Sequence, residues 1–203
     1  MTELLVNSKK AEIIRKFEKR LEALFNKCES PIEKLFLAYF YDYCDFVFMS
    51  RTEFITREIV PENEGTDNAY FSESFDLQEG CCFFKIIGLK LIENDIGGET
   101  RTSIYPQYEV QYADTKYRLD FAVIIERNGE QKLLGIECDG HEWHSTKERI
   151  RLDNQRMRNL HGLGWQIFRY SGSELFADTF KCILDFERNA IYGMPDLNQD
   201  FLK

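Results

Sequence analysis

The fold is decided by residues 117–139, which read YRLDFAVIIERNGEQKLLGIECD. Two largely apolar runs, 117–126 and 131–139, flank the polar turn RNGE at 127–130. Two such runs joined by a short polar turn predict a β-hairpin. The segments FAVII and LLGI are apolar at consecutive positions, which is typical of strands buried on both faces. We therefore expect helices on both sides of a sheet that contains this hairpin.

The sequence on either side of the hairpin predicts the remaining elements. Further strands are expected at 53–60, 82–92, 105–112 and 165–170, the third of them joined to the hairpin by a turn at 113–116. Apolar residues at steps of three and four predict helices at 8–28, 31–49, 145–161 and 173–190. The expected fold class is α/β, with a mixed central sheet flanked by helices and a core order of α-β-β-β-α-β-α.

Two of these helices carry a predicted start signal. Ser30, Pro31 and Glu33 form a capping box with proline at the first helical position. Ser145 and Glu148 have the same spacing and predict a second capping box.

Charge is distributed unevenly along the chain. The 203 residues carry 26 basic and 35 acidic side chains, for a net charge of −9. Residues 61–115 hold three basic and eleven acidic side chains, whereas residues 116–203 hold thirteen and fourteen. The overall charge argues against a phosphate-rich partner, but the local balance of the C-terminal region does not. We interpret 61–104 as an acidic insertion and 61–115 as a surface for a protein partner, a lid or a solvated loop.

The composition also limits the class of protein. Apolar residues make up 43% of the chain, which is enough for a packed core. No stretch is apolar enough for a membrane span or a secretion signal, and the six cysteines form no CxxC pair. A reduced cytoplasmic protein without membrane contact is expected. We expect one domain over 1–203, with an N-terminal helix at 1–30 and a core site region at 105–190.

Three acidic residues lie on the buried strands of the hairpin. Asp120 is in the first strand, and Glu137 and Asp139 end the second. Residues two apart on a strand point to the same face, so Glu137 and Asp139 project together and Cys138 points away. Buried carboxylates are unfavourable unless they are paired or bind a metal. Oxygen ligands favour Mg²⁺ or Mn²⁺ over zinc.

Two alternatives stay open for these acids. The first is pairing with Arg118, Arg169 or a helix N-terminus, which would give the acids a structural role. The second is a zinc site made of Cys138, His141 and His144. Strand alternation disfavours the zinc site, because it turns Cys138 to the opposite face from the acids.

These residues belong to motifs whose order and spacing are specific. The strings are SPIE at 30–33, YRLDFAV at 117–123, GIECDGHEWH at 135–144, RLDNQR at 151–156 and GWQIFRYSGSEL at 164–175. Together they resemble the PD-(D/E)xK nuclease superfamily. They are most similar to the branch related to very-short-patch repair endonucleases, which carries an ExDG-type third motif. The resemblance covers 28–50 and 105–190 and leaves the acidic middle unexplained.

The resemblance implies a three-layer, restriction-endonuclease-like core and a Mg²⁺- or Mn²⁺-dependent endonuclease. Asp120 and Glu137 match the metal-binding acids of the second and third core strands. The carbonyl of Cys138 would be a further metal ligand. Glu33 matches the acid that the first core helix contributes, although the capping box alone explains a glutamate at this position.

Position 139 departs from the superfamily pattern. A lysine usually stands there, whereas this chain has Asp139, a substitution that the similar branch shares. The positive charge at the site must then come from elsewhere. His141 and His144 follow directly, and we favour His144 as the group that accepts a proton from an attacking water. The alternative is that both histidines only hydrogen-bond the turn.

The predicted helix at 145–161 is rich in basic residues. A helical wheel predicts a buried stripe of Ile150, Met157, Leu160 and His161. Asp153 lies beside this stripe and is expected to pair with Arg149 or Arg156. The residues expected to contact nucleic-acid phosphates are Lys147, Arg149, Arg151, Arg156 and Arg158. The alternative is a solvated face with internal ion pairs.

The function expected from these residues is hydrolysis of phosphodiester bonds in nucleic acid, with DNA as the first candidate. Asp120, Glu137 and Glu33 would hold the metal, and Arg149 or Arg156 would stabilise the charge of the transition state. A homodimer is possible if both strands of a nucleic-acid duplex are cut. The alternative function is a catalytically silent module of the same fold that binds nucleic acid or a protein partner within a larger complex.

Overall fold

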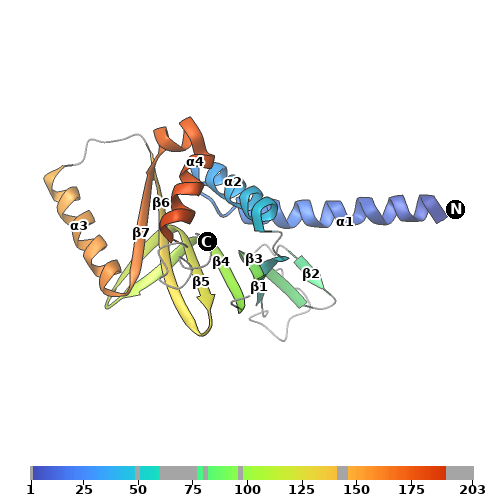
Figure 1. Cartoon of the computed structure of the whole chain (residues 1–203), viewed down its shortest axis with the longest axis horizontal. Coiled ribbons are helices and arrows are strands. Elements are labelled where there is room, and N and C mark those ends of the chain that lie inside the picture. The colour runs from blue at the N-terminus through green and yellow to red at the C-terminus, as the bar shows by residue number, and fades with distance from the viewer. Residues whose placement is uncertain are drawn as a thin grey trace, which may run out of the picture.

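The computed structural model describes residues 2–48, 51–59, 77–79, 82–95, 98–140 and 146–190 (Figure 1). The helices are α1 (Thr2–Phe25), α2 (Pro31–Phe48), α3 (Lys147–Gly162) and α4 (Gly172–Ala190). The strands are β1 (Arg51–Ile59), β2 (Leu77–Glu79), β3 (Cys82–Asp95), β4 (Gly98–Tyr112), β5 (Thr115–Arg127), β6 (Glu130–Asp139) and β7 (Trp165–Ser171).

The strands form one mixed sheet in the order β1-β3-β4-β5-β6-β7, and β2 pairs with β3. Every neighbouring pair from β1 to β6 is antiparallel, whereas β6 and β7 are parallel. A parallel pair needs a crossover connection, and α3 lies in it. The predicted α/β fold with a mixed central sheet flanked by helices is confirmed.

Helices cover both faces of the sheet. α2 and α4 lie together on one side of β5, β6 and β7, and α3 lies on the other (Figure 1). The larger core cluster joins α2 and α4 to the sheet, with Phe36 stacked on Tyr170 and tilted against Phe121. The smaller cluster joins α3 to the opposite face through Leu160, Leu119 and Trp165. Consecutive residues of β5 and β6 are therefore buried, as the apolar runs predicted.

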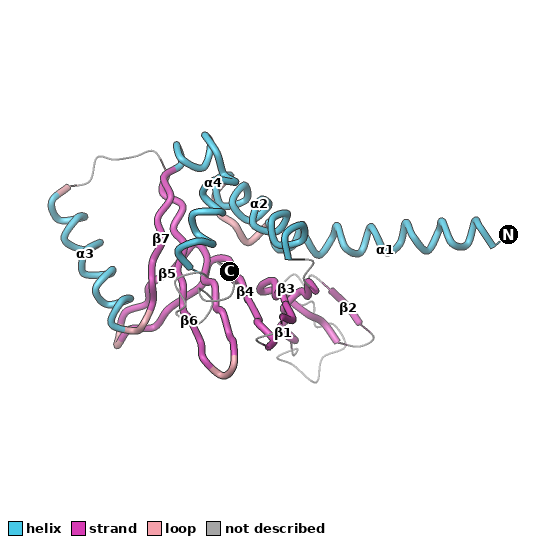
Figure 2. Tube along the Cα trace, viewed as in Figure 1, coloured by secondary structure: helices cyan, strands magenta, loops and turns pink. Residues whose placement is uncertain are grey.

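The N-terminal helix has a different environment. In Figure 2, α1 extends away from the rest of the described chain. Its apolar residues Ile13, Ile14 and Phe17 are 59%, 54% and 40% exposed. Its C-terminal end enters the core, where Leu24 is fully buried, and Phe17 contacts the rings of Tyr41 and Phe54. Among the described helices, none combines the length and the apolar character that a membrane crossing requires.

The predicted hairpins are confirmed. β5 and β6 are joined by Asn128 and Gly129, both with positive φ (52° and 82°). This geometry matches the twist of the flanking strands, and glycine adopts it without strain. β4 and β5 are joined through Ala113, whose φ of 48° is also left-handed.

The region expected to be an insertion takes part in the sheet. β3 lies within it and pairs with β4 from Leu89↔Ile104 to Asp95↔Gly98. The segments 60–76, 80–81 and 96–97 lie outside the described residues. A single domain over 1–203 stays a prediction.

Two predictions for α3 are wrong. The N-cap is Thr146, whose hydroxyl accepts from the Arg149 backbone N–H at 3.3 Å, and Ser145 lies outside the described residues. Glu148 pairs with Arg151 instead of closing a capping box. The wheel also fails in part: Leu160 is buried and Met157 half-buried, but Ile150 is 48% exposed and His161 is exposed.

The close packing of β3 against β4 yields a stability prediction. A Cβ atom on Gly88 would lie 2.5 Å from the backbone oxygen of Ile104, which cannot rotate away. We expect Gly88→Ala to lower the free energy of unfolding by about 1–3 kcal/mol, measured by urea denaturation. Gly162→Ala is the matched control, because a Cβ there meets nothing within 4 Å. Equal stability of the two variants would contradict this packing.

Candidate functional site

The candidate site lies where β5 and β6 part. Their ladder ends at Phe121↔Ile136, so Asp120 and Glu137 are the first residues beyond the last paired rung. The Asp120 carboxylate occupies this gap and its Oδ2 accepts a hydrogen bond from the Cys138 backbone N–H at 2.7 Å. The hairpin therefore places Asp120 beside Glu137, as the sequence predicted.

Glu137 is held by an arginine from α3. Glu137 is 8% exposed, and both of its carboxylate oxygens accept from Arg156, at 2.9 and 2.5 Å. Arg156 also donates to the backbone oxygen of Arg118 at 2.7 Å. A bidentate, partly buried pair of this kind is stronger than an exposed one and fixes both side chains. The acid is therefore paired through Arg156, and Arg118 itself pairs with Glu29.

Asp139 lies on the same face as Glu137 and is also paired. Arg169 of β7 donates to both of its carboxylate oxygens, at 2.9 and 3.2 Å. Arg169 also donates to Asp153 of α3 at 2.5 Å. Asp139 therefore has the arginine partner, Arg169, that the structural alternative expected for one of the acids. The expected pairing of Asp153 with Arg149 or Arg156 is wrong. These ion pairs explain why α3 turns its Asp153–Arg156 side toward the sheet.

Glu33 reaches the site region from the first turn of α2. Its backbone N–H donates to the Ser30 hydroxyl at 3.2 Å, which confirms the N-cap. Its Oε2 accepts from the Glu29 backbone N–H at 2.8 Å, one residue earlier than in the usual capping box. The same Oε2 accepts from Gln107 at 2.7 Å, although Glu33 is only 5% exposed. Glu33 therefore caps α2 and contacts the sheet at once.

Gln107 is the residue of this region that sequence reasoning missed. It belongs to β4 and lies opposite Asp120, between the paired rungs Pro106↔Phe121 and Tyr108↔Leu119. Its φ is 52°, a left-handed conformation that is unusual for a non-glycine residue within a strand. The sequence offers no local signal for this conformation.

Burial and the acids around Asp120 both raise the pKa of its carboxyl group. Burial raises the pKa of Asp120 from 3.8 to about 6, and the hydrogen bond from the Cys138 N–H opposes this shift. Negative charge on Glu137, Glu33 and Asp139 raises the pKa further. No cation is recorded beside the Asp120 carboxylate among the described residues, in contrast to Glu137 and Asp139. Asp120 is therefore the acid that a bound cation would stabilise most.

The donor atoms fit a hard divalent cation in type. Carboxylate oxygens of Asp120, Glu137 and Glu33 are the ligands that Mg²⁺ and Mn²⁺ prefer. Gln107 adds a buried side-chain oxygen, Oε1, that has no hydrogen-bond partner in the described structure. Within the described ranges, however, no three His, Cys, Asp or Glu side chains are close enough together to hold a metal. Metal binding would therefore require Glu137 to exchange its arginine for the cation.

Cys138 follows the predicted alternation. Its side chain is buried in the cluster on the α2 and α4 face, opposite to the arginine-paired acids. Burial raises the pKa of this thiol, with further contributions from nearby acids, which disfavours a thiolate ligand. The other members of the zinc alternative, His141 and His144, lie outside the described residues.

The basic residues of α3 fall into two groups. Arg156 faces the acids, and Arg151 is occupied by Glu148 on the exposed surface. Lys147, Arg149 and Arg158 are exposed, and no ion pair to them is recorded in the described part of the chain. Their predicted contact with nucleic-acid phosphates stays a prediction.

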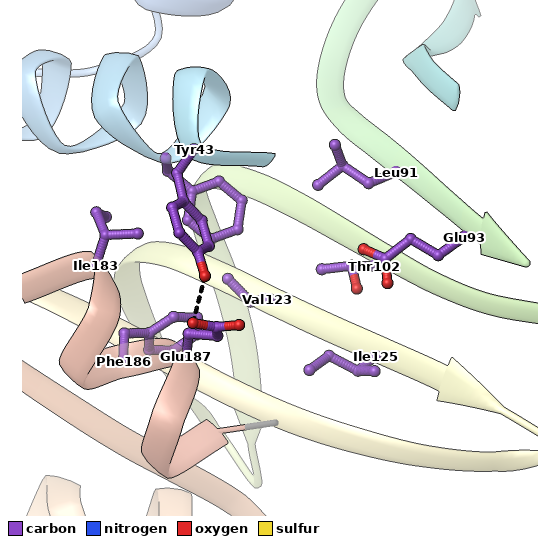
Figure 3. Close-up of a pocket in the computed structure, with 10 residues that line it drawn as sticks. Tyr43, Leu91, Glu93, Thr102, Val123, Ile125, Ile183, Phe186 and Glu187 are labelled. Carbon is purple, nitrogen blue, oxygen red and sulfur yellow. Dashed lines mark hydrogen bonds between the residues drawn. The ribbon is translucent and has the colours of Figure 1, made fainter. Parts of the chain in front are cut away.

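A small apolar pocket lies elsewhere, between α2, α4 and strands β3 to β5 (Figure 3). The Tyr43 hydroxyl donates to Glu187 at its edge, and the pocket is lined further by Phe40, Leu91 and Ile183, among others. None of the acids described above lines it. The pocket therefore does not extend the candidate site.

The Arg156–Glu137 pair gives a prediction about stability. Arg156→Gln leaves the Glu137 carboxylate buried without a cation, and we expect the free energy of unfolding without metal to fall by about 3–5 kcal/mol. Arg151→Gln is the matched control, because Arg151 and its partner Glu148 are both exposed, so solvent screens the pair and its loss should change stability much less. Urea denaturation in a chelating buffer measures both. Similar losses in the two variants would mean that the inner pair is not buried.

The pKa of Asp120 gives a second prediction. Because the folded pKa of about 6 lies above the unfolded value of 3.8, the acid favours folding most below pH 4 and loses this contribution as the pH rises through 6. Asp120→Asn should therefore raise the metal-free free energy of unfolding by about 2–3 kcal/mol at pH 8 and change it little at pH 4. Asparagine still accepts from the Cys138 N–H. Asp114→Asn, in an exposed turn, is the control; a pH-independent effect of Asp120→Asn would contradict the assignment.

One comparison with known families matches this part of the chain. Residues 99–188 match the family model described as REase_MTES_1575, a restriction-endonuclease-like family. No curated protein and no solved structure matches the chain. The matched residues begin in β4 and end in α4, so they contain Gln107, Asp120, Glu137, Asp139 and α3. The match supports a restriction-endonuclease-like superfamily and, at that level, a nuclease function with nucleic acid as the partner.

Proposed function

We propose that the chain is a metal-dependent nuclease that hydrolyses phosphodiester bonds of nucleic acid, with DNA as the first candidate. The observation that carries this proposal is the position of Asp120 and Glu137 just beyond the last paired rung of β5 and β6. Half-buried Asp120 and buried Glu137 lie where the two strands part, and an arginine of α3 binds Glu137, which is an arrangement suited to a cation and a phosphate. The family match over the same residues supports the reaction class.

The residues proposed to hold Mg²⁺ or Mn²⁺ are Asp120, Glu137 and the Cys138 carbonyl, with Glu33 nearby. The cation supplies Lewis-acid polarisation of the phosphate and a lowered pKa for a bound water. Asp120 contributes a carboxylate whose charge is destabilised by burial, so a cation restores its ionised form. His144, which lies outside the described residues, is proposed to accept the proton from the attacking water.

Arg156 is proposed to supply the positive charge that a lysine at position 139 would have provided. Asp139 is engaged by Arg169 and offers no positive charge itself. Arg156 sits on Glu137, and a cation that binds Glu137 would compete with it. Once released, the planar guanidinium can bind two phosphate oxygens at the same site. Arg149, Lys147 and Arg158 are proposed to bind the nucleic-acid backbone farther along α3.

A second candidate function rests on the same ion pairs. Glu137 and Asp139 are each bound by both ends of an arginine guanidinium, Arg156 and Arg169 respectively. This arrangement also suits a silent module of the nuclease fold, in which arginines replace the cation and α3 only binds nucleic acid or a protein partner. The two functions differ in whether the acids bind metal.

A cleavage assay tests the proposed function. Circular duplex DNA, single-stranded DNA and RNA are incubated with the full chain and Mg²⁺ or Mn²⁺. We expect cleavage of at least one substrate, and a loss of about 100-fold or more in Asp120→Asn and Glu137→Gln, because each removes a charged ligand. Asp114→Asn should cut like the wild type.

Two outcomes would contradict the proposed function in different ways. Equal cleavage by wild type and both acid variants would show that another site acts. Binding of DNA without cleavage, together with no Mn²⁺ binding in the millimolar range by calorimetry, would favour the silent module.

A further inference from the structure

Gln107 has a backbone conformation that its place in the sheet does not explain. The other two described non-glycine residues with positive φ, Ala113 and Asn128, lie in hairpin turns where this conformation is expected. Gln107 instead interrupts β4 at φ 52°, with paired residues on both sides. Strained backbone of this kind is retained when the surroundings require it, and it concentrates at functional sites.

At the rung of Gln107 and Asp120, the regular alternation of side chains between the two faces of the sheet is interrupted in both β4 and β5. In β4, Ile104 packs in the cluster of the α2 and α4 face, whereas Tyr108, also at an even position, packs on the α3 face. In β5, Phe121 and Leu119 differ in the same way. Regular alternation would put each pair on one face. The rung of Gln107 and Asp120 is therefore the point at which both strands change face.

The side chain of Gln107 is bound at one end only. Its Nε2 donates to Glu33 Oε2 at 2.7 Å, which ties β4 to the start of α2. Its Oε1 is buried and has no hydrogen-bond partner among the described residues. A buried acceptor without a partner costs stability, and such atoms usually mark a bound water, an ion or a catalytic role.

We propose that Gln107 is a further cation ligand of the site, offering Oε1 to the divalent ion held by Asp120, directly or through a bound water, while its Nε2 orients Glu33. This inference rests on the proposed function. An amide suits this place because it adds an oxygen donor without adding charge. Asp120 already lies near the negative charges of Glu137, Glu33 and Asp139, so a further carboxylate would increase their repulsion.

The test measures Mn²⁺ binding to the full chain by calorimetry and by the Mn²⁺-induced rise in melting temperature. We expect Gln107→Ala to weaken Mn²⁺ binding by about tenfold or more, the usual effect of losing a residue that supports a metal site. Gln107→Gly should weaken it equally while relieving the left-handed strain, so this variant separates metal binding from folding. Gln107→Glu should restore binding but lower the melting temperature in chelating buffer.

Gln111→Ala is the matched control, because Gln111 is an exposed glutamine of the same strand that bonds the Ala113 carbonyl. It should bind Mn²⁺ like the wild type. Unchanged Mn²⁺ affinity in Gln107→Ala and Gln107→Gly would overturn the inference, even if both variants melt at a lower temperature, because that pattern describes a structural glutamine.

Mn²⁺ binding distinguishes a failure of the ligand role of Gln107 from a failure of the metal-dependent function. If the wild type binds Mn²⁺ and Asp120→Asn abolishes binding while the Gln107 variants do not weaken it, only the role of Gln107 is wrong. If the wild type binds no Mn²⁺, both the role of Gln107 as a ligand and the metal-dependent function are wrong.

Discussion

The structure of this site depends on a single constraint, the parting of β5 and β6 after the Phe121↔Ile136 rung. Backbone groups beyond that rung have lost their ladder partners, and buried backbone groups need replacements. The Asp120 carboxylate supplies one by accepting from the Cys138 N–H. The cost is a carboxylate that is mostly buried and whose pKa rises to about 6. The same fork therefore places an acid where a cation is favoured and fixes the strand that carries Glu137 and Asp139.

The remaining acids are kept in place by arginines from two other elements. Arg156 of α3 binds Glu137, and Arg169 of β7 binds Asp139 while also reaching α3 through Asp153. Because pairing compensates the loss of hydration, these acids can remain beside Asp120 without a metal. The pairs also connect β6, β7 and α3 into one unit. α3 thus turns Asp153 and Arg156 toward these pairs, and its apolar Ile150 is exposed.

The features that could be predicted from the sequence are those that depend on residues close together in the chain. The RNGE turn, the two-residue alternation of Glu137 and Asp139, and the Ser30 cap each depend on residues close in sequence, and all three were predicted. The arginine that pairs with Glu137 and the side of α3 that is buried both depend on how α3 rotates against the sheet. The helical wheel assumed that the apolar residues of the helix determine this rotation. The left-handed conformation of Gln107 could not be predicted, because the residues that it meets there, Glu33 and Asp120, are far from it in sequence.

A crystal structure of the full chain soaked in Mn²⁺ tests most directly whether this fork is a cation site. The account predicts an anomalous peak within coordination distance of an Asp120 oxygen, with Glu137 turned to the ion and Arg156 released from Glu137. Mn²⁺ found only elsewhere, with Arg156 still bound to Glu137, would contradict the account and leave the acids with a structural role.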